Sequence, residues 1–264
     1  MTAMTLRAIS DRARAAVALL VLLAAPAGGA AAATYDIAVP AQNSAPHKFL
    51  TIDGQSAGIC PDLLRAIERI DPSLHFSGYT STLSLPLIDL SLTSGRAGAA
   101  CALLDTPARN VAAVRLRTPL YVVRQKAAVR AADPIEVANL DQLGAASGDQ
   151  PVIVTRGSPY ASTLREAGLK VDDTATDREV NLRKLAFGRA RFMYDGEFAL
   201  TKGIAAAGLA GQLRVLPAVL GEQASYFWVS RKQPEIVAQK IESALGRLAA
   251  DGELARIVAR YHVD

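Results

Sequence analysis

The chain has 264 residues, a net charge of +4, 50% hydrophobic residues and only 5% aromatic residues. Its basic residues are scattered and form no stripe interleaved with aromatic residues, which argues against a nucleic-acid-binding protein. A chain of this length can bury a substantial core, either as one large domain or as two lobes.

Residues 1–33 have the pattern of a secretory signal peptide. A basic start with three arginines precedes a short apolar core over residues 15–25, and the small residues 31–33 resemble a cleavage site. The apolar core is shorter than the roughly 20 residues that a membrane-spanning helix needs. We therefore predict an exported, periplasmic protein that is cleaved between Ala33 and Thr34.

The residues that follow the predicted signal alternate between strand patterns and helix patterns. Strands are predicted over residues 35–39, 74–76 and 97–103, and helices are predicted from Pro61 to Ile70 and over residues 85–92. This β-α-β-α-β order predicts a parallel sheet with right-handed crossovers. Arg109 follows the third strand and a short loop, at the edge where open α/β sheets bind ligands.

After an extended run over residues 121–129, a second series of strands and helices begins. Strands are predicted over residues 152–154, 191–194, 213–216 and 225–230, with helices over 178–187, 198–206 and in the segment from 237 to 261. Gly157 and Ser158 follow the first of these strands, where the free N–H groups of a helix start could bind an anion.

The two cysteines, Cys60 and Cys101, both lie at predicted strand-to-helix junctions in the first half of the chain. An exported chain meets an oxidising compartment, and an even number of cysteines then favours a disulfide bond. The alternative is a pair of buried free thiols.

Four blocks of sequence occur in a characteristic order. They are residues 58–64, 106–109 with 117–121, 157–158 with 188–195, and 226–232 with 250–261. The second contains Thr106-Pro107-Ala108-Arg109 and Arg117-Thr118-Pro119-Leu120-Tyr121. Together they resemble the bacterial extracellular solute-binding proteins of family 3, the type II periplasmic binding proteins that deliver amino acids to ABC importers. The resemblance extends over nearly all of the chain after the predicted signal.

The resemblance implies an α/β, two-lobed periplasmic-binding-protein fold of type II. Each lobe would be a mostly parallel sheet flanked by helices, and two hinge strands would join the lobes. Residues 34–123 and 224–264 would form the first lobe and residues 124–223 the second lobe, and the two would close on a small ligand. It also implies a monomer without a cofactor that captures a small carboxylate-bearing solute, expected to be an amino acid, and delivers it to an ABC permease in the inner membrane.

The same resemblance implies roles for individual residues. Arg109 would clamp the α-carboxylate of the ligand, because a planar guanidinium offers two parallel donors to a carboxylate. Asp195 would take the α-ammonium group from the opposite lobe, and the backbone of Gly157 and Ser158 would add donors to the carboxylate. The alternative for Asp195 is a helix N-cap.

The chain also departs from the pattern of the family. Members often carry small hydroxyl residues at the positions of Cys101, Ala102 and Leu104, so the pocket is predicted to be less polar than usual. We include Ala102 and Leu104 among the predicted ligand-binding residues. The aromatic residue that commonly stacks on the ligand is not obvious in the first loop, which offers Asn43, Ser44, Pro46, His47 and Phe49, and we include Phe49 among the predicted ligand-binding residues.

Two other classes of function share this fold. One is an exported enzyme similar to the cyclohexadienyl dehydratases, which act on prephenate or arogenate, with Asp105, Asp195 or Glu197 as the acid. The other is an accessory binding protein of a periplasmic dehydrogenase or of a sensor. We predict a binding protein without catalytic residues. No metal site is predicted either, because His47, His75 and His262 lack the spacing of metal ligands.

Overall fold

The computed structural model describes residues 33–45 and 48–261. The predicted signal peptide up to residue 32, His47 and His262 lie outside the described residues. Within the described ranges, no helix combines the length and the apolar character of a membrane span. The residues from Thr34 onward form one compact unit.

The first lobe is built from the βα units that the sequence predicts, with several short additional strands. Its elements before the first crossing are β1 (Tyr35–Ala38), β2 (Ala41–Gln42), β3 (Leu50–Ile52), β4 (Gln55–Ala57), α1 (Ile59–Ile70), β5 (Leu74–Ser77), β6 (Thr82–Leu83), α2 (Leu85–Ser94), β7 (Ala99–Leu104) and α3 (Pro107–Ala112). Strand β1 pairs in parallel with β5, and β2 pairs in parallel with β6. The N–H of Gly98 donates to the carbonyl of Ala38 at 2.8 Å, so the start of β7 lies beside the end of β1.

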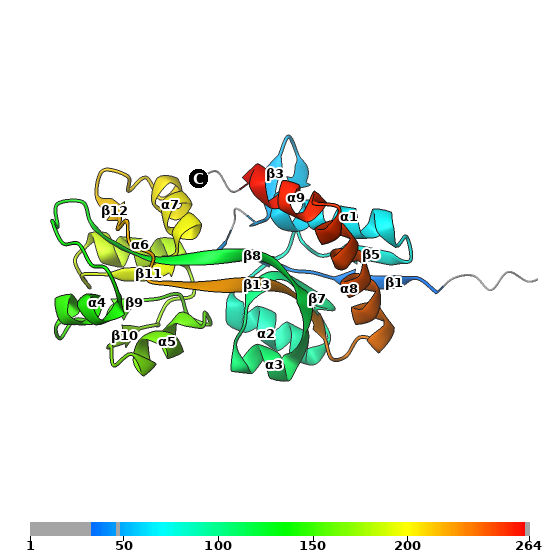
Figure 1. Ribbon diagram of the computed structural model, residues 1–264, viewed down its shortest axis with the longest axis horizontal. Coiled ribbons are helices and arrows are strands. Elements are labelled where there is room, and N and C mark those ends of the chain that lie inside the picture. The colour runs from blue at the N-terminus through cyan, green and yellow to red at the C-terminus, as the bar shows by residue number, and fades with distance from the viewer. Residues whose placement is uncertain (1–32, 46–47, 262–264) are drawn as a thin grey trace, which may run out of the picture. The chain divides into compact units, whose positions relative to one another are not determined.

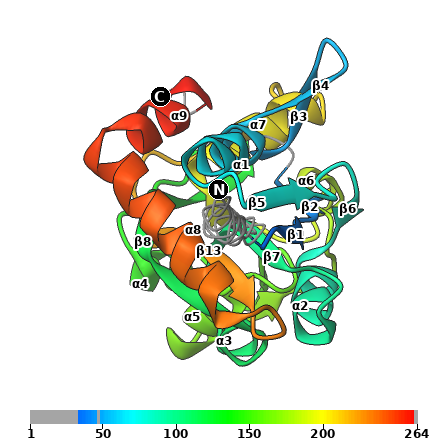
Figure 2. The same ribbon diagram turned by 90° about the vertical axis from the view of Figure 1, so that its right-hand side faces the viewer.

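Helix α1 shows how the sequence positions these elements. Pro61 occupies its first turn, where the missing N–H is not needed, and Leu63, Leu64 and Ile67 form one buried face. That face packs with α8 (Glu235–Ala250) and α9 (Glu253–Tyr261) in one hydrophobic cluster. Figure 2 shows the three helices grouped on one side of the lobe.

The second lobe repeats the plan with its own core. Its elements are α4 (Leu140–Ser147), β9 (Val152–Ile153), α5 (Tyr160–Glu166), β10 (Val171–Asp172), α6 (Arg178–Ala186), β11 (Met193–Gly196), α7 (Glu197–Ala206) and β12 (Leu213–Val215). Strands β10, β9 and β11 pair in parallel, and two hydrophobic clusters cover the two faces of this sheet. Alternating strands and helices with short connections account for the parallel order.

Two long strands connect the lobes. Strand β8 (Ala113–Arg130) pairs antiparallel with β13 (Gly221–Ser230), and Figure 1 shows them side by side between the elements of the first and second lobes. Strand β8 begins earlier than the predicted run because it already pairs with β13 at Ala113. Val123 lies opposite Gln223 in the register, so we propose that the chain hinges at this paired position, where both predicted lobe boundaries meet.

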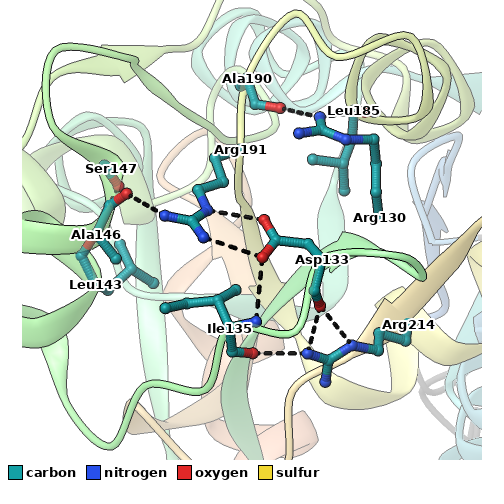
Figure 3. A network of polar contacts seen from close by, with 10 residues as sticks. All are labelled: Arg130, Asp133, Ile135, Leu143, Ala146, Ser147, Leu185, Ala190, Arg191 and Arg214. Atoms are coloured by element: carbon teal, nitrogen blue, oxygen red, sulfur yellow. Dashed lines mark hydrogen bonds and ion pairs between the residues drawn. The ribbon is translucent and has the colours of Figure 1, made fainter.

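A partly buried ion-pair network fastens the connection that follows β8 (Figure 3). The carboxylate of Asp133 accepts from Arg191 Nε at 2.8 Å and from Arg191 Nη2 at 3.0 Å. Arg214 donates to the carbonyls of Asp133 and Ile135, at 2.8 and 2.6 Å from its Nη2. The Arg191 side chain lowers the pKa of Asp133 through its hydrogen bonds. This network therefore belongs to the framework of the second lobe.

The disulfide bond between Cys60 and Cys101 is confirmed, with 5.9 Å between the two Cα atoms. Cys60 lies in the first turn of α1 and Cys101 in the middle of β7. The bond fixes the helix to the strand whose next residues, Ala102 to Leu104, reach the candidate site.

Candidate ligand-binding site

A cavity with a volume of about 900 Å³ lies between the two lobes. The first lobe contributes Lys48, Ala102, Leu104 and Arg109 to its wall, and the second lobe contributes Thr155, Gly157, Ser158, Arg178 and Asp195. The predicted residues other than Phe49 thus come together around one space, in agreement with their position at the ends of strands.

Arg109 is held in place by the first lobe. The hydroxyl of Thr106 caps helix α3 and accepts from the backbone N–H of Arg109 at 3.1 Å, which fixes the start of the short helix. The buried guanidinium donates from Nε to Asp89 Oδ1 at 2.9 Å and from Nη2 to Asp89 Oδ2 at 3.3 Å. Its Nη1 donates to the carbonyl of Leu104, and the guanidinium lies 5.6 Å from the ring centre of Trp228.

These contacts neutralise much of the charge that Arg109 brings to the cavity. Burial lowers the pKa of Arg109 and raises the pKa of Asp89, so desolvation outweighs the attraction between the two groups. A guanidinium has five N–H donors, and three of them are used in these contacts. The remaining donors lie on Nη1 and Nη2, so Arg109 keeps the capacity to bind an anion.

Asp195 has a partner of its own in the second lobe. Its Oδ2 accepts from Arg178 Nε at 2.9 Å, and its Oδ1 accepts from the N–H of Gly196 at 2.8 Å. Asp195 belongs to strand β11, and Arg178 is the first residue of helix α6, which is capped by the side chain of Asp177. The carboxylate that was predicted to bind an ammonium group is therefore already paired with a guanidinium. Asp195 does not cap helix α7, because the N-cap position is Gly196.

Lys48 is a third cation in the wall of the cavity. Its Nζ donates to the carbonyl of Ala102 at 2.6 Å and to Gln42 Oε1 at 3.0 Å. The pKa of Lys48 is lowered to about 7, mainly by burial and also by the charges of Arg178 and Arg109, while Asp195 opposes the shift. Among the described residues, no carboxylate forms an ion pair with this ammonium group.

Ala102 and Leu104 line the cavity through their backbone as well as their side chains. The carbonyl of Ala102 holds Lys48, and the carbonyl of Leu104 holds Arg109. Ala102 has a φ of 56°, in the left-handed region that residues other than glycine rarely occupy. Strand β7 thus turns its carbonyl groups toward the two cations, at positions where family members often carry hydroxyl side chains.

Gly157 and Ser158 lie in the wall of the cavity, but Ser158 has its donors committed. Its N–H and its hydroxyl both donate to the carbonyl of Thr155, at 3.1 and 2.7 Å. The hydroxyl of Thr155 itself is buried and has no hydrogen-bond partner among the described residues. Since a buried hydroxyl rarely stays unpaired, Thr155 is a candidate to bind the ligand.

The position of Phe49 does not agree with the prediction. Its ring is partly buried against the hydrophobic cluster of the first lobe and does not line the cavity. We therefore remove Phe49 from the candidate site. Asp105, one of the three carboxylates considered for catalysis, is also outside the cavity and pairs with Arg115 at 3.0 Å. Glu197 lines the cavity and pairs with Arg124 at 2.9 Å.

Several residues of the site were missed by the sequence interpretation, namely Lys48, Asp89, Thr155 and Arg178. Lys48 lies in the first loop, and Arg178 follows an aspartate at the start of a helix, which is a common arrangement for a surface residue. No spacing in the sequence connects these residues with each other. Within the described part of the chain, no group of three or more histidine, cysteine or acidic side chains could hold a metal ion.

The two-lobed α/β fold, with a cavity between the lobes, is the architecture of the periplasmic-type solute-binding proteins. The chain belongs to the bacterial extracellular solute-binding proteins, family 3, whose family model matches residues 37–264. An extracellular family of this kind indicates an exported protein. No curated protein sequence matches the chain significantly.

Solved structures with the same fold include transport and sensor proteins. A histidine kinase sensor domain with similarity to periplasmic binding proteins has a TM-score of 0.73 and 19% identity, covering 86% of this chain and 96% of the other. The substrate-binding protein of an amino acid ABC transporter has a TM-score of 0.69 and 14% identity, with coverages of 86% and 99%. The BvgS VFT2 domain of Bordetella pertussis has a TM-score of 0.69 and 22% identity, with coverages of 86% and 93%. At these identities the similarity establishes the fold.

Proposed function

We propose that this protein is a monomeric periplasmic binding protein that captures a small carboxylate-bearing solute and delivers it to an ABC permease. The observation that carries the proposal is that the three least exposed of the five cationic side chains in one cavity come from both lobes. Lys48 and Arg109 come from the first lobe and Arg178 from the second. An anion in this cavity would contact both lobes and so favour their closure.

The contact between the lobes supports a role in closure. Gly157 of the second lobe has a φ of 83°, and a Cβ atom there would lie 2.9 Å from Leu85 Cβ and 2.9 Å from Pro86 Cδ of the first lobe. Only a glycine allows this close approach beside the cavity. The two lobes can therefore meet directly at the rim of the proposed ligand site.

Binding is favoured over catalysis by the state of the acidic groups. The enzyme alternative needs a carboxyl group that can donate a proton to the substrate. Asp195 is paired with Arg178, Glu197 with Arg124, and Asp105 lies outside the cavity. The solved substrate-binding protein of an amino acid ABC transporter has the same fold, and this likeness supports a role in import. Delivery to a permease and export through residues 1–33 form part of the proposal.

A thermal-shift screen tests the proposal. The protein is mixed with amino acids, with small organic acids and with prephenate, and we expect stabilisation by members of the carboxylate panel. Binding to the folded state alone stabilises it by about 2.7 kcal/mol at one hundred times the dissociation constant. Turnover of prephenate would instead support the dehydratase alternative, and silence across the whole panel would contradict the proposed ligand class.

Variants of Arg109 complete the test. Arg109→Lys keeps a positive charge but cannot form the two parallel bonds, so we expect weaker ligand stabilisation. Arg165→Lys is the matched control, because Arg165 is an exposed arginine that pairs with Asp173 away from the cavity. Equal ligand stabilisation of both variants would exclude Arg109 from the site.

A further inference from the structure

The buried charges in the cavity wall do not match a zwitterionic ligand. An amino acid brings a carboxylate and an ammonium group, and the ammonium group needs an acidic partner whose charge is still available. Asp195 is 4% exposed, and its two oxygens already accept from Arg178 and from the N–H of Gly196. An added ammonium group at Asp195 would have to compete with a guanidinium that is also nearly fully buried. Of the other two acidic residues that line the cavity, Glu197 pairs with Arg124 and Lys126, and Glu222 is exposed.

A negatively charged group of the ligand, by contrast, has a cation available in the cavity wall. Two of the three cations have acidic partners within their own lobes, Arg109 with Asp89 and Arg178 with Asp195. Among the residues that the structure describes, Lys48 has only the neutral acceptors Gln42 Oε1 and the carbonyl of Ala102. An ammonium group has three donors, so one remains for a ligand. Lys48 is therefore the buried cation of this cavity wall that a ligand anion could pair with.

Two further donors converge on the same space. The hydroxyl of Thr155 is buried without a partner among the described residues. Arg178 uses its Nε in the pair with Asp195, which leaves its terminal nitrogens for other acceptors. Arg178 and Arg109 both act electrostatically on Lys48, so the three cations lie within reach of one another. These groups are all donors, and together they suit one anionic group.

We propose that the ligand is a small organic acid without an ammonium group, whose carboxylate neutralises Lys48 and also binds Arg178 across the cavity. This inference rests on the proposed function and deepens it by naming the chemical class of the solute. The sequence-based expectation of an amino acid is thereby replaced by an anion such as a 2-oxo or 2-hydroxy acid. Such a ligand supplies a negative charge for Lys48 and leaves the pair of Arg178 with Asp195 intact.

The decisive comparison uses pairs of ligands that differ only at the second carbon atom. Isothermal titration calorimetry measures the protein with phenylalanine and phenylpyruvate, with leucine and 4-methyl-2-oxopentanoate, and with glutamate and 2-oxoglutarate. We expect the best oxo acid to bind at least about tenfold more tightly than its amino acid partner, since an unpaired buried charge is costly. An amino acid that binds as tightly as its oxo partner, or more tightly, overturns the inference and leaves the proposed function standing. Absence of binding by every member overturns the proposed function as well.

The role of Lys48 has a readout of its own in proton uptake. The groups that face Lys48 are Arg109 on α3, Arg178 on α6 and Asp195 on β11. An anion beside Lys48 favours its protonated form, so binding at pH 8 takes up roughly one proton, and affinity falls as the pH rises above neutrality. Titrations in two buffers of different ionisation enthalpy measure this uptake. Binding of the oxo acid without proton uptake would overturn the assignment of Lys48.

Variants of Lys48 distinguish a role in ligand binding from a purely structural role. Lys48→Arg keeps the positive charge at every pH of interest, so it should bind the oxo acid without proton uptake. Lys48→Met should lose at least about tenfold in affinity for the oxo acid. Lys170→Met is the control, because Lys170 is an exposed lysine that pairs with Asp149 outside the cavity. Equal affinities of Lys48→Met and Lys170→Met would contradict the inference.

Discussion

Arg178 and Asp195 form a buried ion pair in the wall of the cavity, with 2.9 Å between Arg178 Nε and Asp195 Oδ2. The side chains are 9% and 5% exposed. Helix α6 supplies the arginine and strand β11 the aspartate. The pair places a cation and an anion of the same lobe side by side at the ligand site, and this changes what Asp195 can offer to a ligand.

Loss of one member of this pair should destabilise the protein strongly. Asp195→Ala leaves a buried guanidinium without its partner, and we expect a loss of about 3 to 5 kcal/mol in the free energy of unfolding. Urea denaturation at pH 7 measures it. The double variant Arg178→Met, Asp195→Leu should lose less than Asp195→Ala alone, because no buried charge remains. Asp149→Ala, which removes an exposed ion pair, should change stability very little. If the double variant lost as much stability as Asp195→Ala or more, the energetic coupling between Arg178 and Asp195 would be contradicted.

Lys48 should make the stability of the ligand-free protein depend on pH above neutrality. Its pKa is about 7 in the folded protein and 10.5 as the ordinary value, so between these values the unfolded chain binds more protons. The folded state therefore gains stability as the pH rises through this window. Relative to Lys48→Met, the wild type should gain about 2 kcal/mol between pH 7.5 and 9. Parallel curves for the two proteins in urea denaturation would show that Lys48 keeps an ordinary pKa.

Gly157→Ala should impair ligand binding by holding the lobes apart. The new Cβ atom would collide with Leu85 and Pro86, and the positive φ adds local strain. Gly168→Ala is the matched control in the same lobe, with a φ of 80° and no heavy atom within 4 Å of the new Cβ atom. Both variants should lose about 1 to 2 kcal/mol in stability from the left-handed backbone. Only Gly157→Ala should lose ligand affinity, measured by calorimetry, and equal affinities would exclude a role of this contact in closure.

Removal of the disulfide bond should destabilise the protein. The bond joins residues 41 positions apart, and closing a loop of that length in the unfolded chain corresponds to about 4 kcal/mol. We expect the variant Cys60→Ala, Cys101→Ala to lose about that amount in urea denaturation under oxidising conditions. With dithiothreitol the wild type should approach the variant. A loss below about 1 kcal/mol would mean that the bond does not constrain the unfolded chain.

Asp133 should contribute to stability only above the pH at which it protonates. Its pKa is lowered mainly by Arg191, so the contribution is complete above about pH 4, the ordinary range of an aspartate, and is lost as the pH falls through the lower folded value. Asp133→Asn should lose about 2 kcal/mol at pH 7 and converge with the wild type in acid. Glu136→Gln is the control, because Glu136 belongs to the same network but its side chain is 56% exposed. A constant difference from pH 7 to pH 2.5 would contradict the role of the charge.

The sequence by itself determined the main series of strands and helices and the place of Arg109, but not the short strands β2, β3, β4, β6 and β10 or helix α4. Apolar residues at helical spacing in α1 and α8, and the proline at the start of α1, are local signals, because each reports which face of one element is buried. The cysteine pairing could also be anticipated, since export and an even number of cysteines leave few alternatives. Arg109 stood out because a strand, a turn and a helix start placed it at a sheet edge.

Only the tertiary structure decided which charges face each other in the cavity. Arg109 meets Asp89 and Arg178 meets Asp195 across separations of 20 and 17 residues, and Lys48 reaches Ala102 across 54. Such contacts depend on how separate elements pack, and a charged side chain carries no periodic signal that identifies its partner. The same reason explains Phe49, whose aromatic ring packs equally well against a hydrophobic core or a ligand, and here joins the core. The pairing of charges, which sets the class of ligand, is therefore a property of the folded chain.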